Sequence, residues 1–123
     1  MRLYVLCEGP TEERFVKEVL APHLHNSEIF ATPINLGGVS KYSKIRTELE
    51  ILCKCDPTAF VTTMLDYYKL PSDTPGKGTT GDIYKRSKEI ETAVTANLGA
   101  QRNLLVNSTK NVRLKKGATC AQF

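Results

Sequence analysis

The chain has 123 residues, of which 41% are hydrophobic and 24% are charged, and its formal net charge is +4 at neutral pH. A chain of this length forms one domain with a real core, and one functional site is the most to expect. No apolar run approaches the length of a membrane span, and acidic residues from Glu8 to Glu13 interrupt any signal-peptide core. We therefore expect a cytoplasmic protein that does not enter a membrane.

The first strand and the residue after it are the main functional signal. Leu3 to Cys7 is a nearly unbroken apolar run, which is typical of a central strand buried on both faces of a parallel sheet. Gly9 permits a tight turn, and Pro10 suits the first position of a helix. Open α/β sheets bind ligands where their strands end, so Glu8 is a candidate catalytic residue. The alternative is a solvated turn acid.

The next elements follow from hydrophobic periodicity. Apolar residues at helical spacing predict a helix of three to four turns after Pro10. Residues 28–36 predict a second strand, at an edge of the sheet because of Pro33. Ser40 is the expected cap of a second helix that ends at Asp56. The apolar stripe of this helix comprises Tyr42, Ile45, Leu49 and Leu52.

A third apolar run, residues 59–65, leads directly to Asp66 and repeats the arrangement at Glu8. The long loop of residues 69–81 contains two prolines and three glycines and is a candidate substrate-contacting flap. Asp82 is the expected cap of a third helix, with its apolar face on Ile83, Ile90, Val94 and Leu98, and Gly99 at its end. Residues 103–107 predict a fourth short strand, and residues 108–123 a basic, poorly ordered tail.

Alternating strands and helices predict an α/β fold of three layers, with about four mostly parallel strands flanked by three helices over residues 1–107. If the first and third strands are neighbours, Glu8 and Asp66 emerge side by side. Two carboxylates there suit Mg²⁺, or Mn²⁺, an ion commonly shared with substrate phosphates. Without a metal, one acid could act as general base or acid, its pKa raised by the other's charge.

Basic residues in the second half of the chain are candidate phosphate contacts, namely Lys69, Lys77, Lys85 and Arg86. A solvated lysine-rich surface is the alternative. Tyr67 and Tyr68 could stack on bases, although alternation at a strand end puts one ring on each face and packing explains at least one.

The segments CEGPTEE (residues 7–13) and TTMLDYYKLP (residues 62–71) resemble the Toprim domain, the metal-binding module of topoisomerases, primases and OLD-type nucleases. They look like a prokaryotic family catalogued as domain of unknown function 4276 and grouped with Toprim. The resemblance covers residues 1 to about 98 and implies a Toprim/Rossmann-like fold. It implies a nuclease-type enzyme acting on nucleic-acid phosphodiesters, with Glu8 as general acid/base or metal ligand and Asp66 as a magnesium ligand. It also implies an association with ATPase partners and phage defence.

The chain departs from the Toprim pattern at the second motif. Where Toprim has Asp-x-Asp, this chain has Asp66-Tyr67-Tyr68, so Asp73 or Asp82 would have to substitute for the second carboxylate. Members of the family usually continue with a longer C-terminal half, so the resemblance predicts a truncated or degenerate member.

Other classes of protein are compatible with parts of the pattern. Residues 75–80 resemble a Walker loop but lack its first glycine and its Ser/Thr after the lysine. A phosphatase-like thiolate at Cys7 is disfavoured because Arg14 is misplaced and Glu8 would raise the thiol pKa. A receiver domain with Asp66 as phosphoacceptor remains open, as does a binding module for nucleic acid or protein without catalysis.

Overall fold

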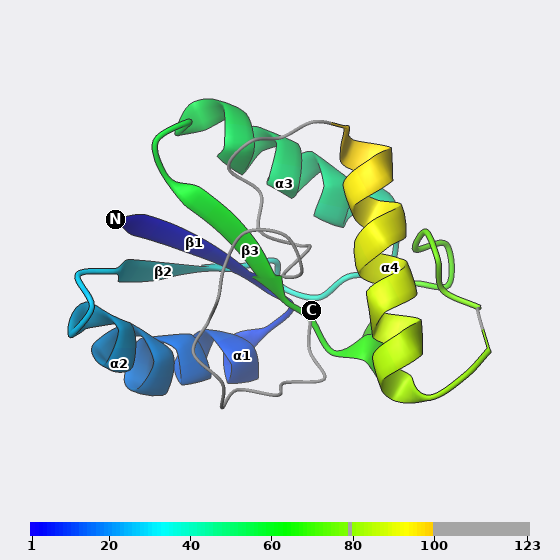
Figure 1. Ribbon diagram of the computed structural model, residues 1–123, viewed down its shortest axis with the longest axis horizontal. Helices are drawn as coiled ribbons and strands as arrows, with labels where there is room; N and C mark the ends of the chain where they lie inside the picture. Colours follow the sequence, from blue (N-terminus) through cyan, green and yellow to red (C-terminus); the bar gives the residue numbers. More distant parts are fainter. Residues whose placement is uncertain (79, 100–123) are drawn as a thin grey trace.

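The computed structural model describes residues 1–78 and 80–99 and contains a parallel sheet at its centre (Figure 1). Its strands are β1 (Arg2–Cys7), β2 (Phe30–Asn35) and β3 (Phe60–Met64), in the order β2-β1-β3. Cys7 is in register with Asn35 on one side and with Met64 on the other. All three strands therefore end at the same edge, and the loops after them lie beside one another.

Helices cover both faces of this sheet (Figure 1). One face carries a continuous helical stretch made of α1 (Pro10–Phe15), η1 (Val16–Leu20) and α2 (Ala21–His25). The other face carries α3 (Tyr42–Cys55) and α4 (Ile83–Leu98). The chain moves outward from β1 to β2 and then back across β1 to β3, so crossovers of one hand place successive helices on opposite faces. The predicted three-layer, Rossmann-like α/β class is confirmed.

The central strand is buried on both sides, as its apolar run predicted. Leu6 packs with α3, α4 and β3 in the larger core cluster, while Val5 and Cys7 pack with Val16 of η1 on the opposite face. Successive side chains of a strand point to opposite faces, so one strand serves both cores. The predicted stripe of α3 is buried as well, except that Leu52 is only partly buried, and Cys53 is buried beside it.

The first helix contains a wide turn that the sequence analysis did not predict. Residues 16–20 form a π-helical segment, in which the N–H of Ala21 donates to the C=O of Val16. Pro22 follows immediately and has no N–H, and in a regular α-helix its ring would clash with the C=O of Glu18. The wider turn relieves that clash, so Pro22 accounts for the π-helical segment.

Helix boundaries match the sequence prediction at α4 and differ from it at α3. Asp82 caps α4 by accepting a 2.9 Å hydrogen bond from the N–H of Lys85, and Gly99 ends it with φ of +75°. The prediction that Ser40 caps α3 is wrong. That helix begins after Lys41, which offers no side-chain cap, and the N–H of Tyr42 donates instead to Asp73 at 3.0 Å. A cap supplied from a distant loop leaves no local sequence signal.

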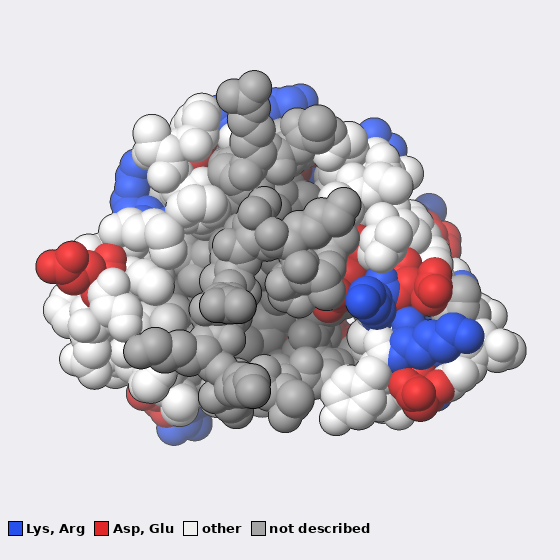
Figure 2. All heavy atoms as spheres, viewed as in Figure 1, with Lys and Arg blue, Asp and Glu red and all other residues white. Residues whose placement is uncertain are grey.

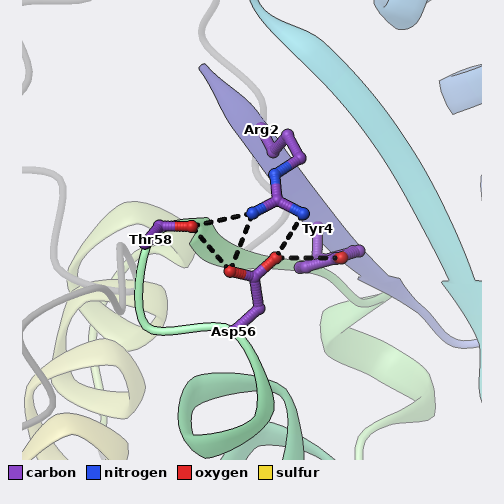
Figure 3. Close-up of polar contacts among 4 residues, drawn as sticks. All are labelled: Arg2, Tyr4, Asp56 and Thr58. Carbon is purple, nitrogen blue, oxygen red and sulfur yellow. Dashed lines mark hydrogen bonds and ion pairs between the residues drawn. The ribbon is translucent and has the colours of Figure 1, made fainter.

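A polar cluster at the amino edge of the sheet joins β1 to the α3–β3 connection (Figure 3). The guanidinium of Arg2 contacts both carboxylate oxygens of Asp56, at 3.0 and 2.8 Å, and donates to Thr58 at 2.7 Å. The hydroxyl of Tyr4 donates to Asp56 at 3.3 Å. This cluster holds the sheet at the end opposite to Glu8.

Two predictions fall outside the described residues, namely the fourth strand at 103–107 and the basic tail at 108–123. Within residues 1–78 and 80–99, no helix is both long enough and apolar enough to cross a membrane.

Candidate functional site

Glu8 lies at the carboxyl edge of the sheet between the loops that follow β2 and β3. Its backbone C=O accepts a 2.9 Å hydrogen bond from the N–H of Gly38, which continues the β1–β2 pairing beyond the strands. On the other side, Asp66 lies close enough for its backbone and its carboxylate to act on the pKa of the Glu8 carboxyl. The two candidate acids therefore emerge next to each other, as predicted for the case in which the first and third strands are neighbours.

Burial raises the pKa of the Glu8 carboxyl above its ordinary value. The nearby backbone of Asp66 and the ammonium of Lys69 lower this pKa, whereas the carboxylates of Glu12 and Asp66 raise it. The net direction is upward. A carboxyl group with a raised pKa can hold or release a proton closer to neutral pH, which suits a general acid or base.

Asp66 shapes the turn that follows β3. Its carboxylate oxygen Oδ1 accepts a 3.0 Å hydrogen bond from the N–H of Tyr68 and so caps η2 (Tyr67–Lys69), a single 3-10 turn. The C=O of Asp66 also accepts from the N–H of Lys69 at 3.1 Å. Backbone and side chain are thus both held, and the carboxyl group has a defined position beside Glu8.

Asp73 and Asp82, the possible substitutes for the missing second aspartate, both have structural partners. Asp73 accepts from the N–H of Tyr42 and Asp82 from that of Lys85. Across residues 1–78 and 80–99, no three His, Cys, Asp or Glu side chains gather closely enough to hold a metal ion. The described site therefore offers Glu8 and Asp66 as a pair, and Asp73 is engaged at the start of α3.

One further acidic residue lies near this pair. Glu12, in the first turn of α1, has its carboxylate close to Gly9, where an added Cβ would be 3.8 Å from Oε2. Its charge helps to raise the pKa of both Glu8 and Cys7. The sequence analysis did not single out Glu12, because Glu8 precedes the helix and the approach of the two carboxylates depends on the turn at Gly9.

The four candidate phosphate contacts have different surroundings. Lys69 acts electrostatically on Glu8 and lies next to the site. Lys77 donates its ammonium to the C=O of Leu70, and the stem of Lys85 lies against Gly81. Arg86 sits over the ring of Tyr67, 5.5 Å from its centroid. On the face in Figure 2, basic and acidic side chains are mixed where α4 runs, so this face does not present a purely basic surface.

The loop of residues 69–81, predicted as a flap, is fastened to the body of the protein at several points. Asp73 binds the start of α3, and Thr74 is buried. Gly76, with φ of +81°, packs so closely on α4 that an added Cβ would lie 2.7 Å from the C=O of Glu89. This part of the loop supports the helices beside the site.

Cys7 is a core residue, as the weak match to a phosphatase loop implied. It is fully buried beside Val16, and burial raises the pKa of its thiol to about 11, with further contributions from Glu12 and Glu13. The predicted direction is confirmed, but these two glutamates supply the charge rather than Glu8. A thiol with this pKa is protonated at neutral pH and is not a nucleophile.

One of the two tyrosines after Asp66 is buried and the other exposed, as predicted, but both lie in the 3-10 turn η2, so strand alternation is not the reason. Tyr67 is buried in the larger core, with 9% of its surface exposed, whereas Tyr68 is 75% exposed. Their rings meet edge to face, with 5.4 Å between centroids and 87° between planes. Packing explains Tyr67 and leaves Tyr68 without a core role.

A comparison with known protein families matches residues 7–112 to the family described as Domain of unknown function (DUF4276). The match covers most of the chain and includes both Glu8 and Asp66, so the chain belongs to this family. No curated protein and no solved structure gives a significant match.

Proposed function

We propose that this protein is a Toprim-like, magnesium-dependent enzyme that acts on nucleic-acid phosphodiesters in the cytoplasm. The observation that supports this most is the adjacency of Glu8 and Asp66 at the carboxyl edge of the sheet, where they follow the paired strand ends Cys7 and Met64. In this proposal Glu8 and Asp66 share the metal ion, and Glu8 is also the general acid or base.

The donor set fits a hard cation, because Mg²⁺ and Mn²⁺ favour carboxylate oxygens and keep several water ligands. When bound, such an ion would offset phosphate charge and activate a nucleophile. The chain's own contribution is positional. Asp66 keeps its carboxylate at the end of β3 through the bond to Tyr68, and Glu8 exchanges a proton with the reacting group, helped by its raised pKa. Lys69 adds positive charge that would attract a phosphate.

Titration calorimetry with Mg²⁺ and Mn²⁺ tests the metal site without requiring a known substrate. We expect binding by the native chain and at least a tenfold loss of affinity in both Glu8→Gln and Asp66→Asn. Asp73→Asn is the matched control, because that carboxylate binds the start of α3, and it should bind metal like the native chain. Cleavage of DNA or RNA by the native chain, and not by Glu8→Gln, would then establish the enzyme. If both variants retain the native affinity and cleavage, the site assignment is wrong.

The alternative of a non-catalytic binding module has one observation in its favour, namely that the described residues hold only a pair of candidate ligands. In that case the same sheet edge binds nucleic acid or a protein, an ATPase partner included, and calorimetry would show no metal binding. The receiver alternative shares the strand order β2-β1-β3. It predicts labelling of Asp66 by a small phosphodonor, which the enzyme proposal does not.

A further inference from the structure

We infer that Tyr68 is a stacking platform for an unpaired nucleobase, so that the site selects single-stranded over double-stranded nucleic acid. Tyr68 takes this role only if the chain binds nucleic acid, as proposed above. The observations behind the assignment are the exposure of the ring, its rigid support and its place in the chain between Asp66 and Lys69.

The ring of Tyr68 is exposed but not loosely attached. Its backbone N–H is bound by Asp66 at 3.0 Å, within the 3-10 turn that closes β3. The rings of Tyr68 and Tyr67 meet edge to face. Tyr67 is itself buried, and the guanidinium of Arg86 lies over its ring, 5.5 Å from the ring centroid. An aromatic ring held in this way loses little conformational freedom when a flat partner stacks on it.

The neighbours of Tyr68 along the chain bear on the chemistry of its partner. Asp66 precedes it by two residues at the candidate metal site, and Lys69 follows it with a positive charge that acts on Glu8. A nucleotide has a flat, apolar base joined to an anionic phosphate, so it complements an exposed ring followed by an ammonium group. A base within a duplex has both faces covered by its neighbours. Stacking on Tyr68 therefore favours a single strand or a frayed end.

Binding of fluorescently labelled oligonucleotides, measured by anisotropy in low salt with EDTA, tests this assignment separately from catalysis. The probes are a short single-stranded DNA of mixed sequence, the same strand with abasic sites in place of the bases, and the corresponding duplex. Tyr68→Ala should weaken binding to the normal single strand by roughly 5- to 150-fold, the range found when a stacking aromatic is replaced by alanine. Tyr68→Phe should bind like the native chain, because it keeps the ring.

The abasic strand separates base contacts from phosphate contacts. On that probe, Tyr68→Ala and the native chain should bind equally, whereas Lys69→Ala should weaken binding to normal and abasic strands alike. Phe30→Ala is the matched control. Phe30 is also a half-exposed aromatic with an edge-to-face partner, His25 at 5.1 Å, but it lies at the opposite edge of the sheet. It should leave binding to every probe unchanged.

Three results would overturn the inference: no binding of the single strand by the native chain, native affinity in Tyr68→Ala, or an equal loss on normal and abasic strands. The proposed enzyme activity is tested separately, by calorimetry. It fails if metal binding does not depend on Glu8 and Asp66. A binding module without catalysis would show the Tyr68 effect and no metal site, and an enzyme without base stacking would show the reverse.

Discussion

The side chain of Glu8, at the carboxyl edge, is held in a position that costs stability. Glu8 is half-buried next to two other carboxylates, and its pKa is raised mainly by burial. A raised pKa means that the folded state binds the proton of this group more tightly than the unfolded chain does. The ionised form at neutral pH is therefore unfavourable for folding, as is common where a group is retained for chemistry.

Replacing Glu8 should consequently stabilise the protein at neutral pH. The destabilisation by ionised Glu8 is absent below about pH 4, the ordinary pKa of a glutamate, and grows as the pH rises through the higher folded pKa. We expect Glu8→Gln to have a higher Tm than the native chain at pH 7 and the same Tm near pH 4, as measured by circular dichroism.

Glu13→Gln is the control of opposite sign. Hydrogen bonds from Lys17 and Asn35 lower the pKa of Glu13, so its replacement should reduce stability at pH 7. A lower Tm in Glu8→Gln at neutral pH would show that Glu8 is an ordinary stabilising residue and would remove this argument for a catalytic role.

At the scale of elements, the loop of residues 69–81 is a support for α3 and α4. Gly76 of this loop has φ of +81°, and a Cβ added there would lie 2.7 Å from the C=O of Glu89 and 3.0 Å from the Cβ of Ala93. Only glycine combines that backbone conformation with that approach.

Gly76→Ala should therefore lower the free energy of unfolding by about 1–3 kcal/mol, the usual cost of a strained backbone position, with the contact on α4 adding to it. Gly78→Ala is the matched control. Its φ is also positive, at +119°, but nothing lies within 4 Å of an added Cβ. Urea unfolding compares the two, and an equal loss in both variants would mean that the packing on α4 contributes nothing.

On the scale of the whole molecule, the sheet is held at both ends. The loops around Glu8 join its carboxyl edge, and Asp56 joins its amino edge by binding Arg2, Tyr4 and Thr58 (Figure 3). The hydrogen bond from Thr58, followed by the charge of Arg2, lowers the pKa of Asp56. The contact between Arg2 and Asp56 connects residues 54 positions apart in the sequence and so restrains the long-range pairing of β1 with β3.

Asp56 should stabilise the fold in a pH-dependent way. A lowered pKa gives stability that is present above the ordinary value of 3.8 and is lost as the pH falls through the folded pKa. Asp56→Asn should be less stable than the native chain at pH 7, and the difference should shrink below about pH 4. Urea unfolding at several pH values measures this.

Glu18→Gln is the control for Asp56→Asn. It removes an exposed ion pair with Arg14 and should change the free energy of unfolding little, because such pairs contribute little to stability. A constant difference between native and Asp56→Asn at all pH values would contradict an ionic contribution.

Much of this protein follows from local sequence signals. The apolar run of residues 3–7 indicated a strand buried on both faces, Pro33 indicated an edge strand, and Asp82 and Gly99 marked the two ends of α4. These predictions succeeded because burial on a strand, the missing N–H of proline and helix capping depend on residues near one another in the chain.

Only the tertiary structure decided what depends on distant segments. Glu8 and Asp66 come together from two turns far apart in the sequence, and Asp73 caps a helix that begins 31 residues earlier. Tyr67 and Tyr68 differ by one position, yet the packing of α4 on the sheet buries one and leaves the other in solvent. Sequence patterns report the local backbone, whereas the partners of a polar group and the exposure of a ring are set by which surfaces meet when the sheet and helices pack together.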